Sequence, residues 1–327
     1  MSLAERIILE LAKDNDFASD EALAQNLGVS SEAVHEALAQ LRAEGLVIND
    51  VHNTAYRLAY PVDPMGEDGI SQELGEAACR FDIHYKRSTE STNDDTKELA
   101  RSGAVDGTVV VASGQSRGKG RRGRSFFSPE GCGVYLSMLV REPRIPNNPL
   151  MLTVAAAVAV SRAIKQVCGL DASIKWVNDV YLNRKKVCGI LTEAETNLDT
   201  GLPQWAVVGI GINVYEPPEG WPAELADKVG ALTVEVKVDQ RNKLAAAIIT
   251  HLDALLEDFE SDAVLKEYFE RSNIIGQHVR LHSGEESLGV VEVVEIADDL
   301  SLRVRRLEQG SSSIESYCSA DTRVELI

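Results

Sequence analysis

The stretch from Gln115 to Phe126, QSRGKGRRGRSF, is the most basic short run in a chain whose formal net charge is −18. Arginine and lysine supply charge-assisted donors to phosphates and carboxylates, and glycine lets the backbone approach a ligand closely. We therefore predict a loop that handles an anionic small molecule and becomes ordered when that molecule binds. Its basic residues are Arg117, Lys119, Arg121, Arg122 and Arg124, and its glycines are Gly118, Gly120 and Gly123.

Different interpretations of this loop are weaker. The spacing G-x-G-x-x-G is also that of a dinucleotide-binding fingerprint, which needs a helix directly after the glycines. Here the following SFFSPEGCGVYLSMLV is typical of a turn and then a strand. A nucleic-acid patch would interleave aromatic residues with the cations, but Phe126 and Phe127 stand together at one end. A solvated cationic turn is the simplest alternative.

A second set of polar residues lies in KWVND and in RKKVCGILTE, which follows it closely. We expect a hairpin that brings Lys175, Asn178, Asp179 and Lys186 together and continues into a strand with Glu193. Lysines beside a carboxylate and a phosphate stabilise developing negative charge. A third set, Ser91, Thr92 and Asn93, stands at an expected helix start, where capping the helix is the commoner role of such residues.

The elements that would position these groups indicate an α+β protein. Residues 1–60 predict three helices and a hairpin, the pattern of a winged helix-turn-helix. Gly28 is expected to end one helix with a positive φ, and Ser30 or Ser31 to begin the next. Residues 61–72 are rich in proline, glycine and acid and are predicted to be a linker.

Two further regions follow. Residues 73–272 alternate strand and helix signals and predict a mixed sheet, with a buried helix over NPLMLTVAAAVAVSRAIKQVCG. Residues 273–327 alternate apolar and polar residues between turn signals, which predicts a small all-β module.

Composition limits the classes of function. A sequence pI of 4.8 argues against bulk attraction to nucleic acid or to an anionic membrane. Five scattered cysteines without a C-x-x-C pair indicate reduced thiols rather than a metal centre. The N-terminus lacks the pattern of a secretion signal, and the longest apolar run, Val154 to Val160, is far shorter than a membrane span. We expect a cytoplasmic protein with no membrane partner.

Taken in order, ESTND, GQSRGKGRRGRSFFSP, KWVNDVYLNRKKVCGIL and VVGIGINV resemble the motifs of the bifunctional biotin protein ligases that are also biotin operon repressors. The resemblance implies a winged helix, a central mixed-sheet domain of the biotin/lipoate ligase type, and a small C-terminal SH3-like β-barrel. It also implies two reactions. Biotin and ATP with Mg²⁺ give biotinyl-5′-AMP, and a lysine of the biotin carboxyl carrier protein of acetyl-CoA carboxylase then takes the biotin.

The resemblance assigns roles by motif position. Lys186, Asp179 and Arg121 would be catalytic, and Asp179 is the one residue considered as a metal ligand. Biotin would contact Ser91, Thr92, Asn93, Gln115, Lys119, Gly120, Arg121, Lys186 and Gly189. ATP or the adenylate would contact Gly118, Arg122, Gly123, Arg124, Phe126, Lys175, Asn178, Asn213 and Trp221.

The chain departs from the family pattern at several positions. Lys119 replaces an arginine, which keeps the charge but loses the two-pronged donor. Phe126 replaces a tryptophan, and Val177 replaces a proline. Cys188 lies close to Lys186, which suggests a site sensitive to oxidation.

The resemblance further implies a homodimer that forms on adenylate binding and binds operator DNA, through Ser30, Ser31, His35 and Gln40. Residues 1–60 nevertheless hold ten acidic and four basic residues, a net charge of −6. A winged helix that binds no DNA is therefore an alternative. A lipoate or octanoate ligase, whose site lacks the arginine-rich loop, is less favoured, and so is a ligand sensor without catalysis.

Overall fold

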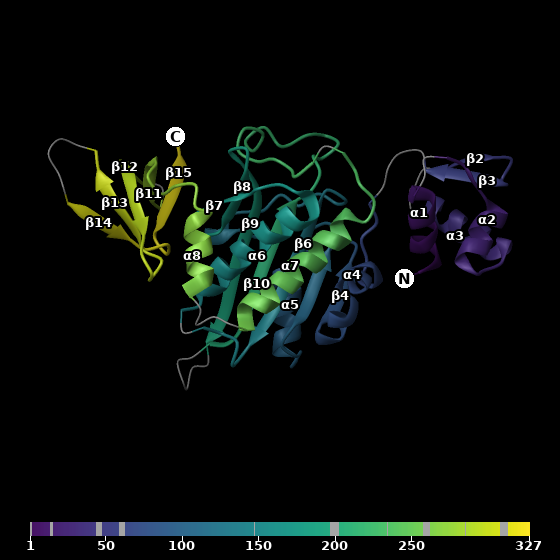
Figure 1. Ribbon diagram of the computed structural model, residues 1–327, viewed down its shortest axis with the longest axis horizontal. Coiled ribbons are helices and arrows are strands. Elements are labelled where there is room, and N and C mark those ends of the chain that lie inside the picture. Colours follow the sequence, from purple (N-terminus) through teal and green to yellow (C-terminus); the bar gives the residue numbers. More distant parts are fainter. Residues whose placement is uncertain are drawn as a thin grey trace.

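The computed structural model describes residues 2–13, 16–43, 48–58, 63–146, 148–196, 203–233, 235–257, 262–284, 286–307 and 313–327. Three groups of elements follow one another along the long axis of the molecule (Figure 1). Each group has its own sheet, with three, seven and five strands. The fold is thus mixed α and β around a central mixed sheet.

The N-terminal group contains α1 (Leu3–Lys13), β1 (Ala18–Ser19), α2 (Asp20–Leu27), α3 (Ser31–Ala43), β2 (Ile48–Val51) and β3 (Ala55–Leu58). The expected helices and hairpin are confirmed. The Ser19 hydroxyl caps α2, and Gly28 ends that helix with a φ of 67°. Its apolar side chains form a core of their own, separate from the core of the remaining chain.

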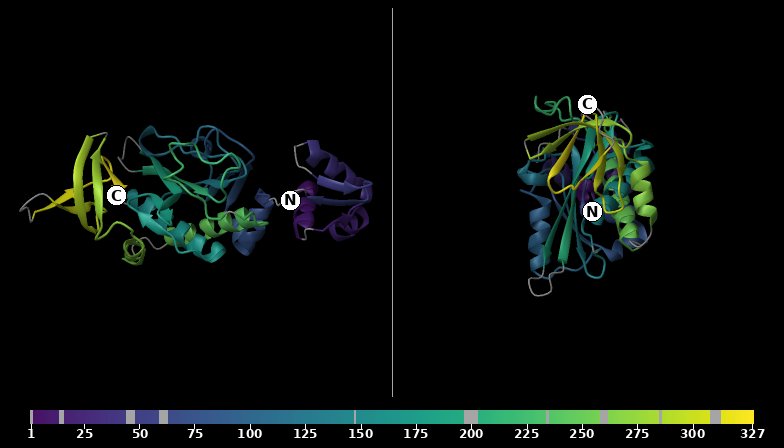
Figure 2. Two further views of the ribbon diagram at one scale, coloured as in Figure 1. Left: turned by 90° about the horizontal axis from the view of Figure 1, so that it is seen from above. Right: turned by 90° about the vertical axis from the view of Figure 1, so that its left-hand side faces the viewer.

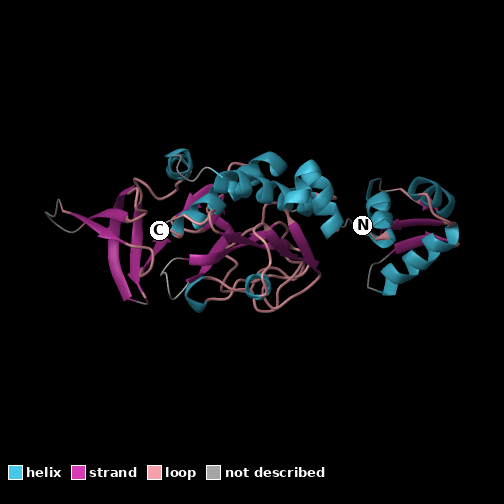
Figure 3. Cartoon of the chain, turned by 90° about the horizontal axis from the view of Figure 1, so that it is seen from below, coloured by secondary structure: helices cyan, strands magenta, loops and turns pink. Residues whose placement is uncertain are grey.

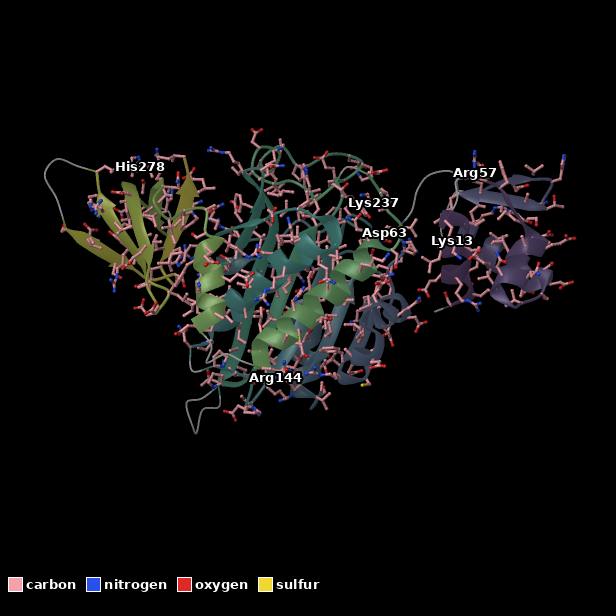
Figure 4. All side chains as sticks on the ribbon, in the orientation of Figure 1. Lys13, Arg57, Asp63, Arg144, Lys237 and His278 are labelled. Atoms are coloured by element: carbon pink, nitrogen blue, oxygen red, sulfur yellow. The ribbon has the colours of Figure 1, made fainter. Side chains whose placement is uncertain are left out.

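The central group begins earlier than expected. The predicted linker over residues 63–72 is wrong, because α4 (Glu67–Leu74) packs on α7 (Gln240–Glu257) and Ile70 is fully buried. Asp63 is also buried and accepts a 2.7 Å hydrogen bond from the Tyr215 hydroxyl. It lies beside Lys237 on the side that faces the N-terminal group (Figure 4). Residues 61 and 62 lie outside the described residues.

The central sheet has the strand order β4-β5-β6-β10-β9-β8-β7, in which β4 and β5 are parallel and the other neighbours antiparallel. Its strands are β4 (Asp82–Lys86), β5 (Thr108–Ala112), β6 (Gly133–Arg141), β7 (Ser173–Lys175), β8 (Asp179–Leu182), β9 (Lys185–Thr196) and β10 (Pro203–Asn213). The accompanying helices are η1 (Gly75–Arg80), α5 (Thr92–Arg101), η2 (Arg121–Gly123), α6 (Leu150–Cys168), α7 (Gln240–Glu257) and α8 (Asp262–Glu270).

Helices cover the sheet unevenly. Figure 3 shows α6 and α7 together on one face, with long loops on the other. The helix α5 contacts β5, β6 and β10, and β6 is buried along nearly its whole length. By length and composition α6 would pass for a membrane span, but 67% of its apolar window is buried inside the fold. It is the buried helix that the sequence predicts.

The C-terminal group is an antiparallel sheet in the order β14-β13-β12-β11-β15. Its strands are β11 (His278–Ser283), β12 (Glu286–Ile296), β13 (Leu302–Arg306), β14 (Ile314–Tyr317) and β15 (Thr322–Leu326). Its buried side chains join the core of the central group without a break. Figure 2 shows this sheet standing at one end of the molecule, beyond α8.

Candidate functional site

A small pocket lies where the start of α5, the basic loop and the strands β9 and β10 meet. Six of the residues predicted to bind biotin line it, whereas Gly120, Arg121 and Lys186 do not. Phe126, expected at the nucleotide, lines it as well, and Leu191, Gly209, Ile210 and Gly211 complete it without having been predicted. The six predicted residues are Ser91, Thr92, Asn93, Gln115, Lys119 and Gly189.

Hydrogen bonds fix the polar wall of this pocket. The backbone N–H of Thr92 donates to Gln115 Oε1 over 2.9 Å, and Gln115 Nε2 donates to Ser128 Oγ over 3.0 Å. The buried Ser137 hydroxyl lies 2.8 Å from Thr92 Oγ1 and 2.7 Å from Asn93 Oδ1. Ser91 makes no side-chain cap to α5, so capping does not explain this serine.

Ser137 was missed at the sequence level. Its signal is a single hydroxyl in the otherwise apolar strand GVYLSMLV. A buried hydroxyl needs a hydrogen-bond partner, and the wall of the pocket supplies it.

Glycines make room for the pocket. A Cβ at Gly209 would lie 1.9 Å from Asn93 Oδ1, and one at Gly211 would lie 2.6 Å from Phe126 Cε1. At Gly189 it would lie 3.0 Å from Lys186 Nζ. The GIGIN segment therefore carries glycine because side chains on α5 and in the basic loop occupy the space over the strand.

A cluster of charged groups lies next to the pocket. Lys186 Nζ is 2.6 Å from Asp179 Oδ1 and 5.9 Å from the centre of the Phe126 ring. Asn178 Nδ2 donates to Asp179 Oδ1 over 3.1 Å and to the Ile190 carbonyl over 3.0 Å. Lys186 and Asp179 thus sit together on the predicted hairpin, with Asn178 holding the carboxylate.

Arg121 joins the basic loop to this cluster. Its guanidinium donates to Asn178 Oδ1 over 3.1 Å and to the Ser319 carbonyl over 2.6 Å. Burial and the neighbouring Arg122 lower the pKa of Arg121 from its ordinary value. A second cavity of about 300 Å³ lies beside Arg121 and Arg122, between Thr153, Ile190 and Ala320.

Lys175 lies deeper than expected for a residue that contacts a nucleotide. Burial lowers the pKa of its ammonium group, whose Nζ is 3.4 Å from the Tyr181 hydroxyl. Its side chain therefore packs against the hairpin itself.

Asn213 and Trp221 lie at the far end of β10 and in the segment after it. Asn213 Nδ2 donates to the Gly230 carbonyl over 3.0 Å, which fastens that segment to the strand end. Trp221 meets Phe127 edge to face, with ring centres 6.2 Å apart. Its indole N–H is buried without a hydrogen-bond partner among the described residues.

The basic loop follows a defined path. Gly120 N–H donates to the Arg124 carbonyl over 2.7 Å, and Phe126 N–H donates to the Gly118 carbonyl over 2.8 Å. Gly123 has a φ of 71° at the tip, and Arg124 is exposed. Acidic neighbours reduce the repulsion among the cations, because Lys119 pairs with Asp94 and Arg117 with Glu90. Ordering on ligand binding stays a prediction.

Two sequence-level expectations concern metal and thiol chemistry. No group of three or more metal-ligating side chains occurs within the described residues. Asp179 is a single carboxylate paired with Lys186, and its role as a metal ligand stays a prediction. The suggested oxidation sensitivity of Cys188 is not supported, because complete burial raises the pKa of this thiol and thiolates are the reactive form.

The N-terminal residues assigned to DNA differ in their surroundings. The Ser30 hydroxyl accepts the Ala33 N–H and so caps α3. His35 lies on the exposed face of α3 with Gln40, and its Nε2 is 3.4 Å from Asp20 Oδ2. Glu32 and Glu36 share this face. All four cations are used within the domain. Arg6 donates to the Leu27 carbonyl, Lys13 pairs with Glu10, Arg42 pairs with Asp50, and Arg57 lies over the Phe17 ring.

Comparison with known proteins gives a consistent result. A sequence profile of the Biotin/lipoate A/B protein ligase family matches residues 85–213. The chain is 36% identical over 241 residues to the bifunctional ligase/repressor BirA of Bacillus subtilis. The aligned region covers 73% of this chain and 72% of that protein. It is 29% identical over 288 residues to the protein of the same name from Escherichia coli, covering 86% of each.

A solved structure shares the fold. The biotin protein ligase from Aquifex aeolicus in complex with biotin and ATP superposes with a TM-score of 0.63 at 26% identity, over 75% of this chain and 99% of that one.

Proposed function

Because the chain belongs to the biotin/lipoate A/B protein ligase family and is a biotin ligase, we propose that it works through biotinyl-5′-AMP and delivers biotin to a lysine of a biotin carboxyl carrier protein. In the first step a biotin carboxylate oxygen attacks the α-phosphorus of ATP and pyrophosphate leaves. In the second step the lysine amine attacks the acyl carbon, the acyl–phosphate bond breaks, AMP leaves and the amine loses a proton.

The observation that carries this proposal is a narrow polar pocket beside a cluster of cations. Thr92 and Gln115 offer donors and acceptors that suit the neutral ureido ring of biotin. The ion pair of Lys186 and Asp179 lies next to the pocket, because the Lys186 side chain is close to Phe126 and Gly189, which both line it. A carboxylate in the pocket and a phosphate outside it would meet near Lys186 and Arg121, which screen their repulsion.

In this scheme Phe126 belongs to the pocket that it lines, and Lys175 belongs to the hairpin against which it packs. Biotin takes the pocket, with Lys186, Asp179 and Arg121 as catalytic residues. Arg122, Arg124 and the loop glycines hold the adenylate, with Asn213 and Trp221 on its adenine side. The indole N–H of Trp221 has no hydrogen-bond partner in the part of the chain that the structure describes, which supports a polar ligand atom there. Mg²⁺ enters with ATP and neutralises its phosphates.

A lipoate or octanoate ligase is a less suitable assignment. Such a site needs a long apolar channel, whereas hydroxyl, amide and ammonium groups make up a large part of the lining of this small pocket. The biotin protein ligase from Aquifex aeolicus was solved in complex with biotin and ATP.

Biotin-dependent pyrophosphate release from ATP tests the first step. Lys186→Met should reduce the rate by about 100-fold or more, because one charged donor at the developing charge is lost. Lys185→Met is the matched control, since this neighbour points its ammonium group to the Ala226 carbonyl at the surface. A parent protein that releases no pyrophosphate with biotin and ATP would overturn the proposal.

We also propose that residues 1–60 are a winged helix that binds operator DNA of biotin-synthesis genes in an adenylate-dependent homodimer, with residues 273–327 as an SH3-like barrel. Three helices with a hairpin, and two relatives named ligase/repressor, favour this assignment. The contacts would come from Ser31, His35 and Gln40, and the reaction would take place in the cytoplasm.

Few cations are available to neutralise phosphates, so we expect DNA binding to weaken sharply with salt and to need both protomers. A gel shift with the chain's own biotin-operon control region, with and without biotin and ATP, tests this. The absence of a shift at low salt would identify the N-terminal group as an appendage of a ligase that does not bind DNA.

A further inference from the structure

A row of alternating charges runs along α5 from the basic loop to β9. Lys119 Nζ lies 2.6 Å from Asp94 Oδ2. Asp94 Oδ1 lies 2.9 Å from Lys97 Nζ, which is also 2.9 Å from Glu193 Oε1. Glu193 Oε2 finally accepts a 2.8 Å hydrogen bond from Asn93 Nδ2.

The two residues at the ends of this row line the biotin pocket, and the residues between them do not. Lys119 and Asn93 line the pocket, whereas Asp94, Lys97 and Glu193 do not. The Asn93 amide is fully used by the protein, since Oδ1 accepts from Ser137 and Nδ2 donates to Glu193 and to the Leu191 carbonyl. Asn93 therefore shapes the wall, and Lys119 is the charged group at the mouth.

The charges of the row support one another. Burial opposes ionisation of Asp94, but hydrogen bonds from Lys119 and Lys97 outweigh it and lower the pKa of the carboxyl below 3.8. Burial likewise opposes the charge on Lys97, while Asp94 and Glu193 raise its pKa above 10.5. Both shifts favour the charged forms of Asp94 and Lys97, and the Asp94 carboxylate is held from both sides.

The ion pair with Asp94 restrains the conformation of the Lys119 side chain. A lysine ammonium is a point charge on a flexible stem, and it lacks the planar two-pronged geometry of arginine. Freezing such a side chain costs conformational entropy. The carboxylate of Asp94 restrains the stem, and Lys97 in turn restrains that carboxylate.

We propose that Asp94 is a positioning residue for biotin binding, which aims the Lys119 ammonium at the mouth of the pocket. The proposal rests on the function proposed above. It concerns the affinity for biotin and not the chemical step, because Asp94 is absent from the pocket lining and from the cluster around Lys186.

Steady-state kinetics of Asp94→Asn tests the proposal. We expect the KM for biotin to rise about fivefold, as for the loss of one ion pair, with kcat and the KM for ATP unchanged. The matched control is Asp95→Asn. Asp95 is the next residue of α5 and is also ion-paired, to Lys86 at 3.0 Å, but it lies outside the pocket lining. An unchanged or lower KM in Asp94→Asn, or an equal rise in Asp95→Asn, would overturn the proposal.

Repeating Asp94→Asn in a Lys119→Arg background separates positioning from a general structural role. Arginine needs less help to hold its direction, so the KM for biotin should then change less than twofold. A fivefold rise in both backgrounds would show that Asp94 acts on the fold and not through Lys119. If the parent itself shows no biotin-dependent pyrophosphate release, the proposed function fails; if only the difference between the backgrounds is missing, the inference alone fails.

Discussion

Arg121 and Ser319 are separated by 198 positions in the chain and are joined by a 2.6 Å hydrogen bond from the guanidinium to the carbonyl oxygen. Arg122 adds a 2.9 Å bond to the carbonyl of Ala320. Arg121 also donates to Asn178, so one side chain connects the basic loop, the hairpin beside the pocket and the C-terminal sheet. The basic loop is therefore held over the pocket by contacts from two parts of the molecule, the central group and the C-terminal sheet.

Replacing Arg121 by glycine should release bound biotinyl-adenylate about 100-fold faster, since one charged donor and the tie to Asn178 are both lost. The dissociation rate of preformed adenylate measures this effect. Arg117→Gly serves as the control, because Arg117 is largely exposed and pairs with the exposed Glu90. Equal retention times for Arg121→Gly and the parent would refute the role of the loop as a cover.

A methyl group at Gly209 should disturb the pocket wall. The added Cβ would lie 1.9 Å from Asn93 Oδ1, so the carboxamide must move away from Ser137 and Glu193. Gly209→Ala should cost about 1–3 kcal/mol of unfolding free energy and weaken biotin binding at least tenfold. Thermal unfolding and biotin titration are the measurements.

A second substitution, Asn93→Ala, tests whether the clash of Gly209→Ala is with the Asn93 side chain. If the clash is with Asn93, adding Asn93→Ala to Gly209→Ala should recover part of the lost stability, because the two substitutions share one contact. A double variant that is less stable than Gly209→Ala would count against the clash.

Thiol reagents should distinguish the cysteines by burial. Cys79 and Cys318 are exposed, whereas Cys188 is fully buried and its pKa is raised by that burial. In the native protein Cys79 and Cys318 should be labelled rapidly and Cys188 only after unfolding. Labelling of Cys188 at the rate of Cys79, read by peptide mass mapping, would contradict the packing around Lys186.

Acid should weaken the attachment of α8 to α6. Burial opposes ionisation of Glu267, but hydrogen bonds from Arg162 and Arg271 lower its pKa below the ordinary 4.5. Since the folded pKa is below the unfolded one, this stabilisation is present above pH 4.5 and is lost as the pH falls through the folded pKa.

Denaturant titrations should therefore show the parent more stable than Glu267→Gln at about pH 6, with the difference shrinking toward about pH 3. Glu270→Gln is the control, because Glu270 is an exposed residue of the same helix that forms a long 4.0 Å ion pair with the exposed Lys266. A difference between the parent and Glu267→Gln that does not vary with pH would contradict this assignment.

The sequence predicted the elements well where the signals are local. The cap at Ser30, the positive φ at Gly28 and the absence of a dinucleotide-type helix after the basic loop each depend on neighbours in the chain. The helix α4 was missed because its proline- and glycine-rich surroundings resemble a linker, while its stability comes from packing on α7. Tertiary contacts of this kind override local propensity.

The site was predictable in its residue types but not in its connections. Ser91, Gln115 and Lys186 could be placed by motif. The partnership of Lys119 with Asp94 and the tie of Arg121 to Ser319 could not, because both depend on how separate elements are packed. Ser137 and Gly209 were missed for the same reason, since their importance lies in what faces them across the pocket.

The central claim is ligation of biotin to a protein lysine, and the mass of an acceptor domain tests it most directly. The chain is incubated with biotin, ATP and Mg²⁺ and with a biotin carboxyl carrier domain, and the acceptor is then mapped by peptide mass spectrometry. We predict one biotin in amide linkage on a single lysine, dependent on ATP and strongly reduced in Lys186→Met. An acceptor that stays unmodified, or that is modified only when lipoate or octanoate replaces biotin, would contradict the account.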